Sequence, residues 1–100
     1  MARLILTYWR DIPSALSVRE GRREEKRLLG PRFQEAIDLA AMKAGAIGTD
    51  AYLAEWRRGE AREVAGDLAA AADRAVAEIE SRYDDDTLKT LTAQGGKETP

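Results

Sequence analysis

The sequence has 100 residues, and 16 Lys and Arg side chains stand against 18 Asp and Glu, which gives a net charge of −2 at pH 7. A chain of this length forms one domain with one core, and its balanced charge argues against a generally cationic nucleic-acid-binding protein. The sequence contains no Cys and no His. Disulfides, thiolate nucleophiles, Cys/His zinc sites and imidazole acid–base catalysis are therefore excluded.

The N-terminal third of the sequence predicts β-structure. Residues 3–9 carry two alternating and mostly apolar sets of side chains, so we expect a central strand that is covered on both faces. A turn around Pro13 leads into a second, antiparallel strand over residues 14–20 with one solvated face. Residues 23–29 are a candidate third strand, although the charged run from Arg22 to Lys26 is a poor strand former.

The remaining two thirds predict helices. A first helix begins at Pro31 and ends at Gly45, and a short second helix, with Tyr52, Leu53 and Trp56 on its apolar face, ends at Gly59. The longest helix follows a predicted cap at residue 67. Shorter pieces complete the chain: a strand or extended connector over 61–65, a helical turn over 87–93 and a disordered tail over 94–100.

Together these elements predict an α+β fold. We expect one domain over residues 1–93, in which a small antiparallel sheet of two to four strands begins with an N-terminal hairpin and packs against two or three helices. Net charge changes along the chain from +3 over residues 1–35 to −5 over residues 63–100. Such a charge dipole can orient an encounter with a partner.

Aromatic and basic residues concentrate in two short segments. The first contains Trp9, Arg10 and Asp11 beside a rigid turn. These residues either close the core and brace the hairpin, or they anchor a partner, since Trp, Tyr and Arg dominate interface hot spots. The second segment offers the same choice between core packing and an interaction edge, and its residues are Tyr52, Trp56, Arg57 and Arg58.

The basic stretch over residues 19–32 is the candidate anion site. It includes Arg22 and Arg23, but Glu residues interrupt it and no aromatic residue inside it could stack on a base. A solvated hairpin that docks on an acidic protein surface is the favoured interpretation, and nucleic-acid binding is disfavoured.

No metal or cofactor motif is present in the sequence. The loop over residues 45–50 lacks the Lys of a phosphate-binding loop, and the acidic triplet over 84–86 lacks the spaced ligands of a calcium loop. The N-terminus lacks the long apolar run of an export signal, and no stretch approaches the roughly 20 apolar residues of a membrane span. We therefore expect a cytoplasmic protein without cofactors.

Five separated strings resemble a small bacterial family whose members are labelled virulence factors, after the conserved virulence factor C type proteins. They are YWRDIP at 8–13, GRR at 21–23, RFQEAID at 32–38, AAM at 40–42 and GTDAYLAEW at 48–56. The resemblance carries over no catalytic residues. Stand-alone members look like those encoded beside methylenetetrahydrofolate-reductase-like and corrinoid methyltransfer proteins, which implies an accessory role in one-carbon metabolism.

The sequence thus favours a non-enzymatic module that docks on a larger cytoplasmic protein through its aromatic and basic clusters. Two alternatives remain open. Arg10, Arg22 and Arg23 could contribute to a site for a folate-like anionic small molecule, since Arg pairs with carboxylates in a bidentate manner. The chain could also be a nucleic-acid-binding regulator, whose affinity would fall steeply as salt rises.

Overall fold

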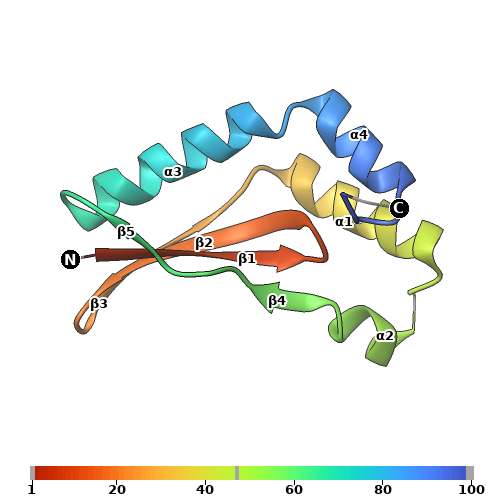
Figure 1. Cartoon of the computed structure of the whole chain (residues 1–100), viewed down its shortest axis with the longest axis horizontal. Coiled ribbons are helices and arrows are strands. Elements are labelled where there is room, and N and C mark those ends of the chain that lie inside the picture. Colours follow the sequence, from red (N-terminus) through yellow and green to blue (C-terminus); the bar gives the residue numbers. More distant parts are fainter. Residues whose placement is uncertain (1, 47, 99–100) are drawn as a thin grey trace.

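The computed structural model describes residues 2–46 and 48–98. Within these residues the chain forms five strands and four helices, arranged as in Figure 1. The strands are β1 (Ala2–Trp9), β2 (Ile12–Glu20), β3 (Arg23–Leu28), β4 (Trp56–Arg58) and β5 (Arg62–Val64). The helices are α1 (Pro31–Ala44), α2 (Thr49–Leu53), α3 (Leu68–Arg82) and α4 (Asp85–Ala93).

All strands belong to one antiparallel sheet, which confirms the predicted α+β class and the N-terminal hairpin. The order is β3-β2-β1-β4, and β5 pairs with the other half of β1. β1 is therefore central, as predicted. The charged segment over residues 23–28 does form a strand, because β2 offers a complete partner edge from Ala15 to Glu20.

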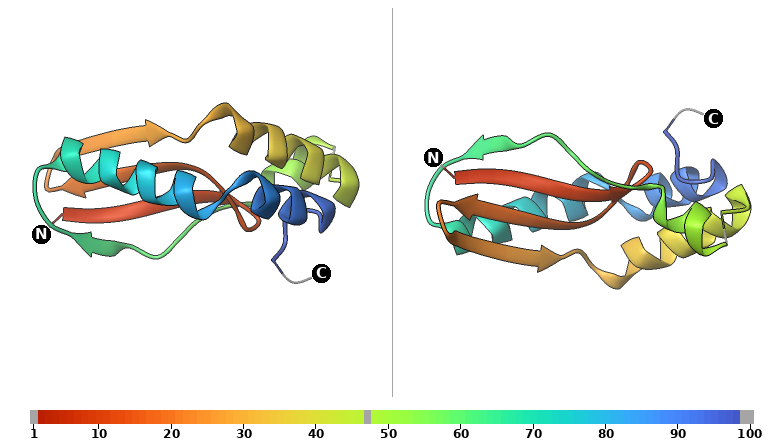
Figure 2. Two further views of the ribbon diagram at one scale, coloured as in Figure 1. Left: turned by 90° about the horizontal axis from the view of Figure 1, so that it is seen from above. Right: turned by 90° about the horizontal axis from the view of Figure 1, so that it is seen from below.

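Helix α3 covers one face of the sheet and leaves the other face uncovered along most of its length (Figure 2). The side chains under α3 include Leu4 of β1 and Val18 of β2, which are paired partners and almost fully buried. The expectation that β1 is covered on both faces is wrong for Ile5 and Thr7, which are half-buried and line a hollow on the uncovered face. The sequence does not distinguish the two faces of β1, because Leu4 and Leu6 on one face and Ile5 and Thr7 on the other are all apolar or nearly so.

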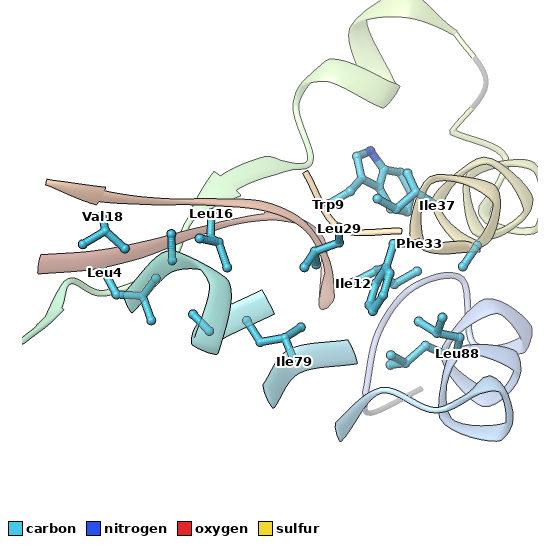
Figure 3. Packing of buried hydrophobic residues seen from close by; sticks show 14 of the residues in the cluster. Leu4, Trp9, Ile12, Leu16, Val18, Leu29, Phe33, Ile37, Ile79 and Leu88 are labelled. Atoms are coloured by element: carbon cyan, nitrogen blue, oxygen red, sulfur yellow. The ribbon is translucent and has the colours of Figure 1, made fainter. Parts of the chain in front are cut away.

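The second half of the core lies beyond the β1–β2 turn, where α1 packs against α4. Figure 3 shows Trp9 beside Ile37 of α1, with Ile12, Phe33 and Leu88 nearby. The predicted helix boundaries at Pro31 and Gly45 are confirmed; Gly45 has a φ of 74°, and its N–H donates to helix carbonyls. The cap at residue 67 is also confirmed, since the Asp67 carboxylate accepts a hydrogen bond from the Ala70 N–H at 3.1 Å.

The second predicted helix is shorter than expected. Helix α2 ends at Leu53, and Trp56 begins strand β4 instead of completing the helix. The free edge of β1 provides the physical reason, because it pairs with residues 56–58 and satisfies their backbone groups more completely than one further helical turn would. Tyr52 and Trp56 nevertheless touch, with their ring centroids 5.9 Å apart.

The segment expected to be a disordered tail is packed onto the domain as far as residue 98. The Asp11 N–H donates to the Gly96 carbonyl at 2.8 Å, and the Glu98 N–H donates to the Asp11 carboxylate, also at 2.8 Å. Gly95 and Gly96 have φ values of 70° and 91°, which let the chain fold back after α4. Residues 99 and 100 lie outside the described residues.

No helix in the described part of the chain combines the length and the apolar character needed to cross a bilayer.

We predict that Gly96→Ala lowers the free energy of unfolding by about 3 kcal/mol, because it combines a positive φ with a new contact. A Cβ at Gly96 would lie 2.9 Å from the Trp9 ring. Gly21→Ala is the matched control, since Gly21 also has a positive φ, 62°, but has nothing within 4 Å of its Cβ position. Urea denaturation should show a loss of only about 1 kcal/mol for Gly21→Ala. Equal losses for the two variants would contradict the close packing of Gly96 on Trp9.

Candidate functional site

Trp9 is a core residue rather than an exposed anchor. Its side chain is 0 % exposed, and its indole Nε1 donates to the Tyr52 carbonyl at 2.9 Å. The rings of Trp9 and Tyr52 are stacked with centroids 5.8 Å apart. For Trp9, the structure therefore supports core packing over the anchoring of a partner.

Arg10 and Asp11 hold the C-terminal segment over this core. Arg10 has a φ of 53°, and its guanidinium lies over the Trp9 ring, where Nη1 donates to the Gly95 carbonyl at 3.0 Å. Its Nε lies 3.3 Å from the Glu55 carboxylate, close enough for an ion pair but without hydrogen-bond geometry. Arg10 is thus committed to contacts within the chain.

Arg57 belongs to the same group of contacts. Its Nε donates to the Arg10 carbonyl at 2.9 Å, its Nη2 donates to the Asp11 carboxylate at 3.1 Å, and its guanidinium lies over the Tyr8 ring. We call the following residues the turn cluster, because they surround the β1–β2 turn: Trp9, Arg10, Asp11, Tyr52, Trp56 and Arg57. Six of the nine candidate residues therefore lie together, but as a structural unit.

The β2–β3 turn lies at the opposite end of the sheet (Figure 1). Arg22 and Arg23 lie at this turn, and both are exposed. The nine residues of β2 separate this turn from Arg10, a distance of about 30 Å at the usual rise per strand residue. One small ligand spans much less than this distance. The structure therefore does not bring Arg10, Arg22 and Arg23 together as an anion site.

Arg58, the ninth candidate, lies on the uncovered face of the sheet. There it borders a hollow of about 490 Å³. Ala15 and Ser17 of β2 form the floor of the hollow, and larger side chains of the neighbouring strands rise on both sides. We call this hollow the trough, and its face-directed residues are Ile5, Thr7, Ala15, Ser17, Arg19, Glu24, Lys26, Leu28 and Arg58.

The trough is lined by both apolar and polar side chains, and cations lie at its rim. Its apolar members include Leu28, which is 82 % exposed. Among the face-directed residues of the trough, three cations stand against one carboxylate, that of Glu24, which lies 3.5 Å from Arg19 and 3.8 Å from Lys26. The lining of the trough therefore carries a net positive charge.

The neighbouring Arg27 is directed away from the trough. Its guanidinium contacts Asp73 of α3 at 3.0 Å and Glu25 at 2.9 Å. The hydrogen bonds that Arg27 donates to these two carboxylates, first Glu25 and then Asp73, raise the pKa of Arg27. The alternation along β3 thus assigns Arg27 to the helix side and leaves Lys26 and Leu28 for the trough.

A second hollow of about 360 Å³ lies between the end of α3, α4 and the C-terminal segment. Tyr83 lines part of this hollow. Its pKa is raised, and the main cause is burial of its hydroxyl. The Tyr83 hydroxyl is therefore protonated at neutral pH and is a poor base. Among the described residues, no group of three or more His, Cys, Asp or Glu side chains could hold a metal ion.

Sequence reasoning missed most of the trough. The solvated face of β2 was predicted, but the small size of Ala15 and Ser17 on that face was not used as a signal. The other available signal is Leu28, a large apolar side chain at the end of a strand whose other residues are charged. Local sequence signals do not reveal that this face is uncovered, because that depends on where α3 packs (Figure 2).

A family model described as Virulence factor matches residues 7–92. This chain belongs to the Virulence factor family. The match confirms the resemblance stated from the sequence, and it includes the turn cluster and most of the trough. No curated protein and no solved structure matches the chain.

We predict that Arg57→Ala and Arg58→Ala have different effects on stability, although the two residues are adjacent. Arg57→Ala removes two hydrogen bonds and a contact with Tyr8, so urea denaturation should show a loss of about 1 kcal/mol. Arg58→Ala removes no such contact among the described residues and should leave the unfolding midpoint unchanged. A similar loss for both variants would contradict the assignment of Arg57 to structure and of Arg58 to the trough.

Proposed function

We propose that this Virulence factor family protein is a non-enzymatic protein-binding module that docks on a larger cytoplasmic protein through the trough. The single observation behind this proposal is the one-sided sheet: α3 covers one face, and the other face carries a hollow of about 490 Å³ whose lining includes Ile5, Ala15 and Leu28. Exposed apolar surface with a polar rim is typical of interaction sites.

Leu28 and Ile5 are the apolar side chains that a partner would bury. Leu28, at 82 % exposed, has nearly all its side chain available for burial. Full burial of such a side chain contributes about 1.5–3 kcal/mol to association before the costs of binding. At most interfaces a few well-buried side chains contribute most of the binding free energy.

The charge of the trough favours an acidic partner surface. Arg58 makes no ion pair among the described residues, and Arg19 and Lys26 share Glu24 at distances of 3.5 and 3.8 Å. These exposed cations would accelerate and orient the approach of a negatively charged partner. The resemblance to members encoded beside methylenetetrahydrofolate-reductase-like proteins makes such one-carbon enzymes the first partners to test.

A folate-like anion is the second candidate, now at the trough instead of at Arg10, Arg22 and Arg23. The hydroxyls of Thr7 and Ser17 lie among the cations there, and a volume of about 490 Å³ lies within the range of small-molecule sites. Calorimetry with folates and the purified chain tests this candidate, since heat of binding that Lys26→Glu removes would favour it over protein docking. Nucleic-acid binding stays disfavoured, as the sequence predicts.

The docking proposal predicts a charge-specific loss of binding. The partner is first identified by affinity purification from the native organism and then purified. The double variant Lys26→Glu, Arg58→Glu should bind it about ten-fold more weakly or worse, because two trough cations become repulsive. The matched control Lys43→Glu, Lys89→Glu makes the same change in net charge on α1 and α4, away from the trough, and should bind normally. Loss of binding in the control alone would overturn the proposal.

A further inference from the structure

The trough follows β2. Ala15 and Ser17 are two residues apart on its floor, between Thr7 and Ile5 of β1 on one side and Leu28 and Lys26 of β3 on the other. Strands on either side of a central strand lie about 10 Å apart. An α-helix with its side chains has a diameter of about 10–12 Å. A helix that lay above β2 would therefore also contact side chains of β1 and β3.

The uncovered face supplies side chains but no free backbone groups. An extended peptide adds to a sheet through main-chain hydrogen bonds at an edge, and the backbone of β2 is already paired with β1 and β3. A helix satisfies its own backbone and needs only side-chain contacts. Helix α3 already binds the opposite face of β2 and β3 in this way. The face thus favours a helix over a strand.

Cations border the channel on both sides. Arg58 of β4 is paired with Thr7, beyond one wall, and Lys26 of β3 is part of the other wall. Arg19 lies at the end of the floor, where it shares Glu24 with Lys26. A helix in the channel would meet the small side chains of Ala15 and Ser17 below and positive charges on both flanks.

We propose that the trough binds an amphipathic α-helix of a partner protein, which lies along β2 with its apolar stripe on Ala15 and Leu28 and its acidic flanks against Arg58 and Lys26. This inference rests on the proposed docking function and specifies the partner element. Such a helix carries apolar residues at i, i+3, i+4 and i+7, with Asp or Glu beside them on both sides. It would complete a second helical layer on the sheet.

Three labelled synthetic peptides of equal length provide the test, by fluorescence anisotropy with the full chain. The first carries a Leu stripe flanked by Glu, the second has the same composition in scrambled order, and the third has Lys in place of Glu. We expect the first peptide to bind at least about ten-fold more tightly than the other two, because only it matches both the channel and its charge.

Two variants locate the binding. Ala15→Trp fills the floor of the channel and should abolish binding of the first peptide, while its circular dichroism stays native, since strands accept aromatic residues on a solvated face. Lys26→Glu with Arg58→Glu should weaken binding about ten-fold, and the control Lys43→Glu with Lys89→Glu, on α1 and α4, should not change it. Should Ala15→Trp prove unfolded, Ser17→Trp fills the same floor two residues along.

The outcomes separate this inference from the docking proposal. Equal binding of the three peptides, no binding of the first, or binding that survives a folded floor variant overturns the helix inference. Concentration-dependent self-association that Ala15→Trp removes would identify a second copy as the occupant and would also overturn it. Docking itself stands if Ala15→Trp still prevents binding of the purified partner, and it fails if the partner binds all trough variants normally.

Discussion

Burial of the Trp9 side chain is the contact on which the rest of the structure depends. The indole lies at the β1–β2 turn, is 0 % exposed, and draws together segments that are far apart in sequence. It donates a hydrogen bond to Tyr52 of α2 and packs against Gly96 after α4. Figure 3 places it beside Ile37 of α1. Removal of a large buried side chain costs about 3–5 kcal/mol, so this position holds together the half of the molecule that α3 does not reach.

The turn cluster contains Trp, Tyr and Arg side chains, the types most common at interface hot spots, but here they make contacts within the chain. Arg10 and Arg57 donate hydrogen bonds within the chain and lie over aromatic rings. These contacts stabilise the β1–β2 turn. The uncovered face of β1, β2 and β3 instead presents exposed side chains such as Leu28 and Lys26.

The local signals in the sequence predicted the elements well where a residue acts on its own backbone. Pro31 begins α1, Gly45 ends it with a left-handed φ, and Asp67 caps α3. The same reasoning failed at Trp56, because its backbone pairs with β1 instead of continuing α2. Reasoning from local signals also failed for residues 94–98. Their polar and glycine-rich composition is typical of a free tail, but hydrogen bonds with Arg10 and Asp11 hold them on the domain.

The sequence by itself determined the α+β class, the N-terminal hairpin, the main helix boundaries and the absence of thiol and imidazole chemistry, because each depends on local backbone preferences, periodicity or residue type. Only the tertiary structure decided which aromatic and basic residues are buried and which face outward. Trp9 and Leu28 illustrate the difference: the aromatic residue is enclosed, and the aliphatic one is exposed. Burial depends on which distant segments cover a residue, and α3 covers one face of the sheet but not the other.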